Sequence, residues 1–245
     1  MKETRFFYVP DAAVADELPA EECAHVARVL RLQSGDEIML TDGKGTFYKA
    51  LLTVASPKRC RYEVVEALPQ TPAWKGRIHL AVAPTKNMDR MEWLAEKATE
   101  VGFDALTFLS TAFTERKVVK EERIDKILVA AMKQSHKAWK PELHPLCQLP
   151  DFLKSRPEKR KYVAHCYSQD DFPDLKMDKP FLFDAMGEQE DTVVLVGPEG
   201  DFSVDEVRMA VAAGFEPVSL GNSRLRTETA ALVAVHLMQL KNRCS

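Results

Sequence analysis

After residue 72 the chain alternates short apolar runs with amphipathic helical patterns, and this alternation limits the possible folds more than any other feature of the sequence. The apolar runs lie at residues 78–83, 105–109, 162–166, 181–183, 193–196 and 217–220. The longest helical pattern between them covers residues 121–137. Such alternation is typical of a mostly parallel sheet with helices on both faces. We therefore predict an α/β domain over residues 73–245.

The first 72 residues follow a different pattern. Short strands are predicted at residues 5–9, 37–41, 46–56 and 61–67, and one helix is predicted to start after Pro19. Residues 68–72 contain two prolines and no hydrophobic period, which predicts a linker. The expected organisation is a small β-barrel over residues 1–72 followed by the α/β domain.

Local signals predict where two helices of the α/β domain begin. Asp89 and Glu92 have the spacing of a capping box, and Gly102 is expected to end that helix. Ser203 and Glu206 have the same spacing and predict a second capping box. Each of these helices follows directly on a predicted strand and its loop.

Composition excludes several classes of protein. The 34 Lys+Arg and 37 Asp+Glu residues give a net charge of −3, which excludes a uniformly basic nucleic-acid-binding surface. No apolar run approaches the roughly 18 residues of a membrane helix, and no signal-peptide stretch follows Met1, so we expect a cytoplasmic protein. The five cysteines are scattered and the six histidines lack metal-ligand spacing, so neither a disulfide framework nor a metal site is predicted.

Two loops that follow predicted strands carry the residues best suited to chemistry, because ligands of open α/β sheets bind at the carboxyl ends of the strands. In the first loop, residues 196–202, glycines on both sides of Pro198 and Glu199 allow a tight turn close to a ligand. In the second, residues 220–230, Arg226 precedes a helix start, where a cation opposes the helix dipole and indicates an anionic partner or a catalytic role. Composition alone also fits ordinary strand-to-helix turns at both places.

Four motifs resemble one family. The segments V-G-P-E-G-D-F-S-x-x-E (residues 196–206) and L-G-x-x-x-L-R-T-E-T-A (220–230) resemble the paired C-terminal motifs of the RsmE family of SPOUT methyltransferases. The segment K-x-x-x-R-x-E-W-x-x-E-K-A-T-E-V-G (86–102) is similar to the first catalytic-domain motif of that family. The segment H-x-x-x-V-L-R-x-x-x-G-D (25–36) is similar to its N-terminal RNA-binding barrel of PUA type.

The resemblance implies an activity and an architecture. Members of this family use S-adenosylmethionine to methylate ring nitrogen-3 of a uridine in 16S ribosomal RNA, and the expected substrate is that RNA in an assembled or nearly assembled small ribosomal subunit. The resemblance also implies a homodimer and a deep trefoil knot in the C-terminal α/β domain. Two alternatives stay open: a ribose 2′-O-methyltransferase on the same fold, and a non-catalytic RNA-binding protein.

The resemblance further implies roles for individual residues. The cofactor is expected to contact Val196, Gly197, Pro198, Glu199, Gly200, Leu220, Gly221, Leu225, Arg226, Thr227 and Ala230, together with His165 at the end of a preceding strand. Arg226 is expected to stabilise negative charge on the uracil carbonyl oxygens, and Glu228 or Glu199 to accept the imide proton. The expected RNA contacts are Arg5, Arg28, Arg31, Arg116, Lys133 and Lys137. No metal is expected.

Three features of the sequence depart from the pattern of the family. Asp201 stands where a third glycine is usual and adds a carboxylate beside the cofactor loop. Lys137 stands where an arginine is usual, and residues 222–224 are more polar than the common loop. The RNA contacts and the fine geometry of the cofactor site are therefore the features in which this chain is expected to differ from the family.

Overall fold

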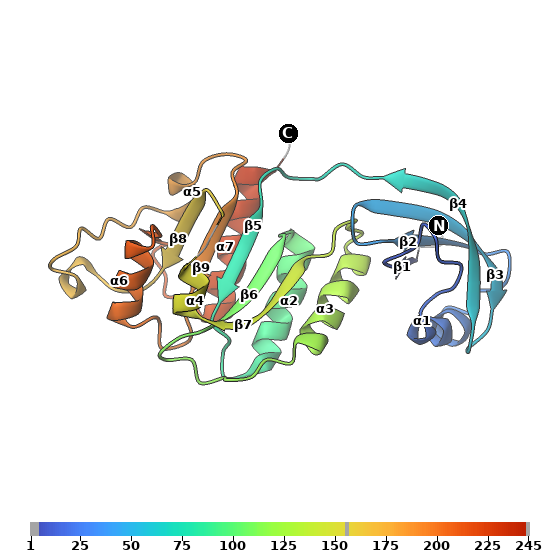
Figure 1. Ribbon diagram of the computed structural model, residues 1–245, viewed down its shortest axis with the longest axis horizontal. Coiled ribbons are helices and arrows are strands. Elements are labelled where there is room, and N and C mark those ends of the chain that lie inside the picture. Colours follow the sequence, from blue (N-terminus) through green and yellow to red (C-terminus); the bar gives the residue numbers. More distant parts are fainter. Residues whose placement is uncertain (1–4, 155–156, 244–245) are drawn as a thin grey trace. The chain divides into compact units, whose positions relative to one another are not determined.

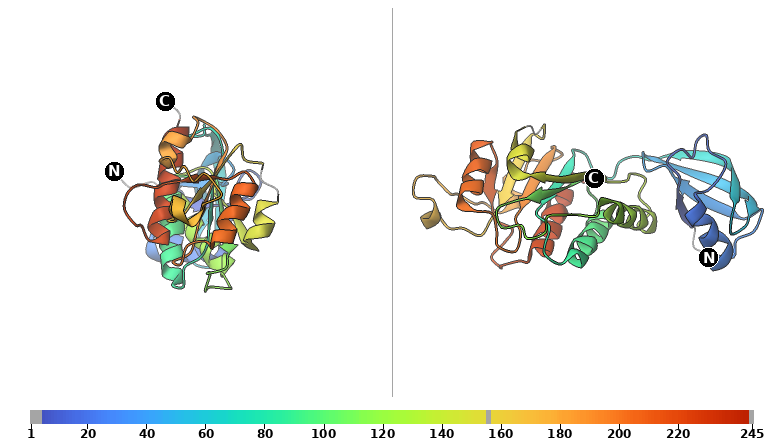
Figure 2. Two further views of the ribbon diagram at one scale, coloured as in Figure 1. Left: turned by 90° about the vertical axis from the view of Figure 1, so that its left-hand side faces the viewer. Right: turned by 60° about the horizontal axis from the view of Figure 1, so that its bottom comes forward.

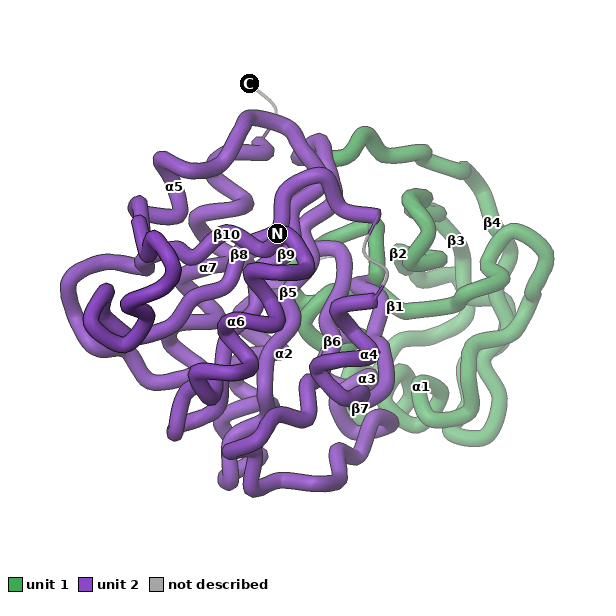
Figure 3. The backbone as a smooth tube through the Cα atoms, turned by 60° about the vertical axis from the view of Figure 1, so that its left-hand side comes forward, with its two compact units in different colours: residues 1–72, 129–140 green, residues 73–128, 141–245 purple. Residues whose placement is uncertain are grey.

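A computed structural model describes residues 5–154 and 157–243 and divides the chain into two compact units. Unit 1 comprises residues 1–72 and 129–140, and unit 2 comprises residues 73–128 and 141–245 (Figure 3). The sequence predicted a single division at residue 72. The structure differs in assigning residues 129–140 to the N-terminal unit.

Unit 1 is built on a four-stranded sheet. The strands are β1 (Phe6–Tyr8), β2 (Glu37–Thr41), β3 (Thr46–Ala55) and β4 (Cys60–Pro69), in the order β1-β2-β3-β4. β1 is parallel to β2 and the other pairs are antiparallel. β4 extends to Pro69, two residues into the predicted linker, because Thr46 and Phe47 pair with its last residues. The helix α1 (Ala20–Ala24) continues into a π-helical turn, His25–Val29, and both pack on the core of this unit.

Residues 129–140 join unit 1 through backbone and ring contacts. The Gly45 N–H donates to the Ala138 carbonyl (3.0 Å), and the Lys140 N–H donates to the Gly43 carbonyl (2.9 Å). Gly45 has a φ of +114°, and a Cβ atom there would lie 2.8 Å from the ring of Trp139, so this turn requires glycine. The helix α3 (Glu121–Gln134) ends before the predicted residue 137 because His136 adopts a left-handed φ of 52°.

Unit 2 contains a six-stranded parallel sheet. Its strands are β5 (Ile78–Val82), β6 (Ala105–Ser110), β7 (Glu142–Gln148), β8 (Arg160–Ala164), β9 (Thr192–Val196) and β10 (Glu216–Val218). Their order in the sheet is β10-β8-β9-β5-β6-β7; Figure 1 labels β5 to β9, and Figure 3 also labels β10. Because all strand pairs are parallel, every carboxyl end lies at the same edge of the sheet. The α/β class predicted from the sequence is confirmed.

Helices cover both faces of this sheet, as the left view of Figure 2 shows. On one face lie α2 (Met88–Val101), α5 (Leu182–Ala185) and α7 (Thr227–Asn242), whose buried residues share a core with β5 and β6. On the other face lie α4 (Leu149–Leu153) and α6 (Val204–Ala212), which enclose a second core around Phe152 and Phe202. The sheet is thus buried on both sides, as its continuous apolar strands require.

Two local predictions are corrected by the structure. Residues 181–183 were predicted to be a strand, but α5 begins at Leu182, because the Asp184 and Ala185 N–H groups donate to the Phe181 carbonyl. The residue that caps α2 is Asn87, whose side chain accepts a hydrogen bond from the Asp89 N–H (3.0 Å), so Asp89 does not form the predicted capping box. Glu92 instead forms an ion pair with Arg123 (2.6 Å).

The second predicted capping box is confirmed. The Glu206 N–H donates to the Ser203 Oγ (3.2 Å), and the Ser203 N–H donates to the Glu206 carboxylate (2.8 Å). This box fixes the start of α6 immediately after the loop that carries Pro198 and Glu199.

Two further findings concern the described residues as a whole. None of their helices is long and apolar enough to span a membrane. Within the same ranges, no group of three or more His, Cys, Asp or Glu side chains is arranged to hold a metal ion.

Candidate active site

The loops that follow β8, β9 and β10 emerge side by side at the carboxyl edge of the sheet. The last residues of these strands are paired in register, Val218 with Ala164 and Ala164 with Val196. With neighbouring strands about 4.8 Å apart, the three loops begin within about 10 Å of one another. The structure therefore brings together the two loops selected from the sequence, with His165 between them.

The loop of residues 197–203 connects β9 to α6 and depends on two glycines. Gly197 and Pro198 are buried, whereas Glu199 and Gly200 are exposed. A Cβ atom at Gly197 would lie 3.0 Å from the Phe202 amide nitrogen, within the same loop. A Cβ atom at Gly200 would lie 3.2 Å from the Cβ of Phe113. The loop is therefore folded tightly on itself and also packs closely on the loop after β6.

Asp201 ties this loop to the loop after β8. One carboxylate oxygen accepts a hydrogen bond from the Cys166 N–H (2.7 Å), and the other accepts one from the Phe202 N–H (2.7 Å). Asp201 has a φ of 65°, a left-handed conformation that glycine and aspartate adopt more readily than most residues. The hydroxyl of Tyr167 donates to the Phe202 carbonyl (2.8 Å) and adds a second link. The departure from glycine at position 201 thus supplies a clip between the two loops.

His165 is buried with unsatisfied ring nitrogens. Its residue surface is 7% exposed, and neither nitrogen has a hydrogen-bond partner among the described residues. Burial, followed by the charge of Lys179, lowers the pKa of His165 to about 4, so the imidazole is neutral at neutral pH. Buried polar atoms in proteins are nearly always hydrogen-bonded, so the two nitrogens can take polar groups of a ligand or water as partners.

The side chains of the second loop differ in exposure: Arg226 faces solvent, whereas Thr227 and Glu228 are buried. Arg226 is the N-cap residue of α7; it is exposed and forms no ion pair with any described residue. Glu228, in the first turn, is 8% exposed, and its Oε1 lies 3.8 Å from the Arg90 Nε. Thr227 is also buried. The arginine is therefore available to a ligand, whereas Glu228 is directed into the protein toward α2.

The remaining residues of the second loop serve mainly to support it. Leu220 and Ala230 are partly buried and pack on the core shared by α2 and α7. Gly221 has a φ of +120°, with open space around a Cβ position, so glycine is required there for the backbone conformation rather than for room. Leu225 is half-buried beside the exposed arginine.

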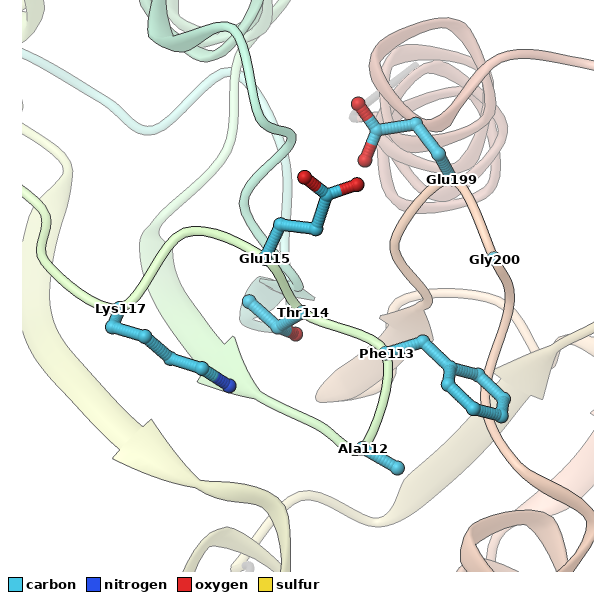
Figure 4. Close-up of a pocket in the computed structure, with 7 residues that line it drawn as sticks. All are labelled: Ala112, Phe113, Thr114, Glu115, Lys117, Glu199 and Gly200. Carbon is cyan, nitrogen blue, oxygen red and sulfur yellow. The ribbon is translucent and has the colours of Figure 1, made fainter.

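A cavity of about 640 Å³ opens beside Glu199, as Figure 4 shows. It is lined by Ala112, Phe113, Thr114, Glu115, Lys117, Glu199 and Gly200. The side chains of Glu115 and Glu199 extend toward the same space in Figure 4. Of the residues expected to bind the cofactor, only Glu199 and Gly200 line this cavity.

Lys86 and Arg116 organise the two carboxylates of the cavity. The Lys86 N–H donates to Glu199 Oε1 (3.2 Å), and the Lys86 ammonium forms an ion pair with Glu115 (3.0 Å). The guanidinium of Arg116 donates to the Lys86 carbonyl (3.1 Å). Sequence reasoning assigned no role to Lys86, Glu115 or Phe113. For Lys86 the available signal was its place at the start of the motif of residues 86–102, and for Glu115 and Phe113 it was their position after β6, at the carboxyl edge of the sheet.

The residues expected to contact RNA divide between the two units. Arg5, Arg28 and Arg31 belong to unit 1 and are exposed. Lys133, also in unit 1, forms an ion pair with Glu22. Lys137 is half-buried, and burial lowers the pKa of its ammonium group. Arg116 lies in unit 2, where it contacts Lys86 beside the cavity. Of these six residues, the three arginines of unit 1 are the exposed ones.

The parallel sheet, the glycine turns at its carboxyl edge and the small β unit before it together make this an α/β protein with a separate N-terminal β unit. A family model described as an RNA methyltransferase domain matches residues 72–239, and one described as an RNA methyltransferase PUA domain matches residues 18–65. The chain belongs to this family of RNA methyltransferases. Among relatives, it is 30% identical to the ribosomal RNA small subunit methyltransferase E of Aquifex aeolicus, over 86% of this chain and 88% of that protein.

Solved structures agree with this family. A probable rRNA-methyltransferase from Porphyromonas gingivalis superposes with a TM-score of 0.87 at 39% identity, covering 96% of this chain and 98% of that one. The ribosomal RNA small subunit methyltransferase E from Neisseria gonorrhoeae, bound to S-adenosyl methionine, superposes with a TM-score of 0.77 at 27% identity, covering 97% and 98%. The family inferred from the four sequence motifs is thereby confirmed.

Proposed function

We propose that this protein transfers a methyl group from S-adenosylmethionine to ring nitrogen-3 of a uridine in the 16S RNA of the small ribosomal subunit. The observation that carries this proposal is the position of Glu199. Its exposed carboxylate lines an open cavity, and one oxygen is oriented by the Lys86 N–H, at the edge where the two glycine loops meet. A uridine N3–H must lose its proton before it can accept a methyl group, and an oriented, accessible carboxylate meets that need.

The residues at the sheet edge fit S-adenosylmethionine. His165 offers two buried, unpaired and uncharged ring nitrogens, and the glycine turns bring backbone groups close to a ligand. Gly197, Pro198, Gly221 and Leu225, with His165, would hold the cofactor. When bound, S-adenosylmethionine supplies an electrophilic methyl group on a positively charged sulfur. The related Neisseria protein contains this cofactor in its crystal structure.

Burial separates the two candidate bases. Glu228 is 8% exposed and its Oε1 faces the Arg90 side chain, whereas Glu199 is exposed to solvent. We therefore assign the proton transfer to Glu199. Its carboxylate takes the proton from N3, the N3 lone pair forms the bond to the methyl carbon, and the electrons of the S–CH₃ bond stay on the sulfur. Arg226, exposed at the start of α7, would stabilise the negative charge on the neighbouring carbonyl oxygens.

We extend the proposal to the architecture expected from the resemblance, namely a knotted SPOUT domain, a closed barrel in unit 1 and a homodimer that acts on ribosomal subunits in the cytoplasm. The course of the chain before α7 supports the knot. Ser219 exchanges backbone hydrogen bonds with Pro180 and Leu182, both 2.9 Å, so the chain runs along the β8–β9 connection. It then enters α7, which packs on β5 and β9. The match of the PUA model supports an RNA-binding role for unit 1.

The proposed function is tested with small ribosomal subunits from a strain that lacks this gene. After incubation with the protein and S-adenosylmethionine, mass spectrometry of the digested 16S RNA should detect 3-methyluridine. A new ribose methyl with no base methyl would instead support the 2′-O-methyltransferase. If calorimetry detected no S-adenosylmethionine binding to the folded protein, the non-catalytic RNA-binding alternative would replace the proposal.

Arg226→Ala tests the role of the guanidinium in the same assay. We expect turnover to fall by roughly 10²- to 10³-fold, the usual effect of removing a group that stabilises developing negative charge. The thermal unfolding temperature should stay within a few degrees of the wild-type value, because the side chain is exposed and has no ion pair with any described residue. Wild-type turnover in Arg226→Ala would remove this residue from the mechanism.

A further inference from the structure

Lys86 is held at three of its groups, two of them by neighbouring residues of one loop. Its carbonyl accepts a hydrogen bond from the Arg116 guanidinium (3.1 Å), and its ammonium group forms an ion pair with Glu115 (3.0 Å). Its N–H donates to Glu199 Oε1 (3.2 Å). Because the carbonyl and the side chain of Lys86 are both anchored, its N–H is restrained in direction, and so is the carboxylate that accepts from it.

The loop between β6 and α3, which supplies both anchors of Lys86, is itself attached to the start of α6. The Ala112 N–H donates to Glu206 Oε1 (2.8 Å), and the other oxygen of that carboxylate caps α6. Phe113 packs against Gly200, where an added Cβ atom would lie 3.2 Å from the Cβ of Phe113 (Figure 4). The loop therefore links the segment before α2, through Lys86, to the loop that carries the candidate base.

We propose that Arg116 is a positioning residue for the methyl transfer: it holds the backbone of Lys86, which in turn orients the Glu199 carboxylate that takes the proton from N3. The resemblance to the family implied an RNA contact for Arg116. Its guanidinium is half-buried and already donates to a backbone carbonyl, which favours positioning. The inference rests on the proposed function and adds the group that orients its base.

Arg116→Ala tests this role, with Lys120→Ala as a matched control. Both substitutions remove one cation from the segment between β6 and α3; Lys120 is exposed, does not line the cavity and has no ion pair with any described residue. With undermethylated small subunits we expect the kcat of Arg116→Ala to fall roughly 10- to 100-fold, the effect of misplacing a reacting group by about 1 Å. The KM for the subunit should stay within about 2-fold of wild type, as should the kcat of Lys120→Ala. Arg116→Lys keeps a donor and should recover part of the loss.

A double-mutant cycle with Glu199→Ala separates the orientation of the base from any other role of Arg116. If Arg116 acts through Glu199, its removal costs nothing further once the carboxylate is gone. We therefore expect the double variant to have the kcat of Glu199→Ala alone, within about 2-fold. Calorimetry should give the wild-type S-adenosylmethionine affinity for Arg116→Ala, and an unchanged thermal unfolding temperature should show that this variant is folded.

The salt dependence of binding distinguishes positioning from a phosphate contact. One cation on one phosphate contributes about 0.7–0.9 to the slope of log affinity against log salt concentration. Filter binding of small subunits should give the same slope for wild type and Arg116→Ala, because a guanidinium that holds Lys86 releases no counterion from the RNA.

Three results would overturn the inference while the wild type methylates N3. The first is a kcat for Arg116→Ala within 2-fold of the Lys120→Ala control. The second is a further loss of kcat when Arg116→Ala is added to Glu199→Ala. The third is a salt slope reduced by about 0.7 or more in Arg116→Ala, which would assign the guanidinium to a phosphate. Wild-type turnover in Glu199→Ala would refute the assigned base and the inference with it, whereas a wild type that forms no 3-methyluridine would refute the proposed function itself.

Discussion

Asp201 illustrates how one substitution in a family motif can acquire a structural role. A glycine at this position would allow the same left-handed backbone but would leave the Cys166 N–H without its present acceptor. The carboxylate accepts two hydrogen bonds from backbone N–H groups, and bonds to a charged acceptor contribute more than neutral ones. The candidate cofactor loop is therefore tied to the loop after β8 at the position where the sequence departs from the family pattern.

Asp201→Gly should weaken cofactor binding while leaving the fold intact. Two charge-assisted hydrogen bonds are lost, so we expect the free energy of unfolding to fall by about 1–3 kcal/mol and the affinity for S-adenosylmethionine to fall several-fold. Asp201→Asn, which keeps one acceptor oxygen and tolerates the same backbone, should lie between wild type and Asp201→Gly. Calorimetry and urea unfolding measure the two effects. An unchanged affinity in Asp201→Gly would show that the clip does not shape the site.

His165 should make the stability of this protein sensitive to acid. Its pKa is about 4 in the folded state and 6.5 in the unfolded chain, so the unfolded chain binds the proton more readily. The contribution to stability is present above pH 6.5 and is lost as the pH falls toward 4. From pH 7 to pH 5 we expect the loss of about 2 kcal/mol in the free energy of unfolding.

The control for this pH dependence is His165→Phe. The aromatic ring fills the same space beside Tyr167 and Phe172 but cannot be protonated. Urea unfolding at pH 7 and pH 5 should therefore show a smaller difference for this variant than for wild type. An equal difference in the two proteins would assign the acid sensitivity to other groups.

At the scale of elements, the capping box of α6 joins the stability of this helix to the position of the candidate-site loop, residues 197–203. Ser203 caps the helix directly after the loop of residues 197–203 turns away from the sheet. Ser203→Ala should lower the free energy of unfolding by about 1 kcal/mol, because one amide of the first turn loses its acceptor. Ser203→Asp retains an acceptor and should recover most of the loss. A Ser203→Ala variant as stable as wild type in urea unfolding would contradict this role.

Sequence reasoning missed β7 and took residues 181–183 for a strand, and each error has its own physical cause. β7 is an edge strand without fully buried residues, so it lacks the apolar run that marked its neighbours. The Phe-Leu-Phe run at residues 181–183 has no period long enough to separate a strand from a helix, and the choice of α5 depends on hydrogen bonds to Phe181 and Ser219. In contrast, the capping box of α6 depends on two residues three positions apart, Ser203 and Glu206, and it was predicted correctly.

At the scale of the whole molecule, residues 129–140 belong to unit 1 although they follow much of unit 2 in the chain. A fragment that begins after residue 72 therefore contains only part of unit 1. Within unit 1, Met132 and Ala138 are buried, His136 stacks on Phe6 at 4.5 Å, and Lys133 pairs with Glu22. A fragment of residues 73–245 retains this segment without its partners. We expect it to unfold at a temperature several degrees below that of the full chain and to bind a hydrophobic dye.

Co-expression with residues 1–72 provides the control for the fragment. Restored partners should raise the unfolding temperature again and reduce dye binding. A 73–245 fragment that unfolds at the temperature of the full chain without binding the dye would show that the segment contributes no stability to the α/β unit.

The sequence by itself determined the α/β class, the α6 start and the two loops that form the candidate site, because each depends on residues close together in the chain. Its four motifs also identified the family. Only the tertiary structure decided which carboxylate is accessible, since Glu228 is buried by α2 and Glu199 is oriented by Lys86, 113 residues away. It also revealed the cavity of Phe113 and the place of residues 129–140. These features depend on distances between segments remote in sequence, which packing of the whole chain sets.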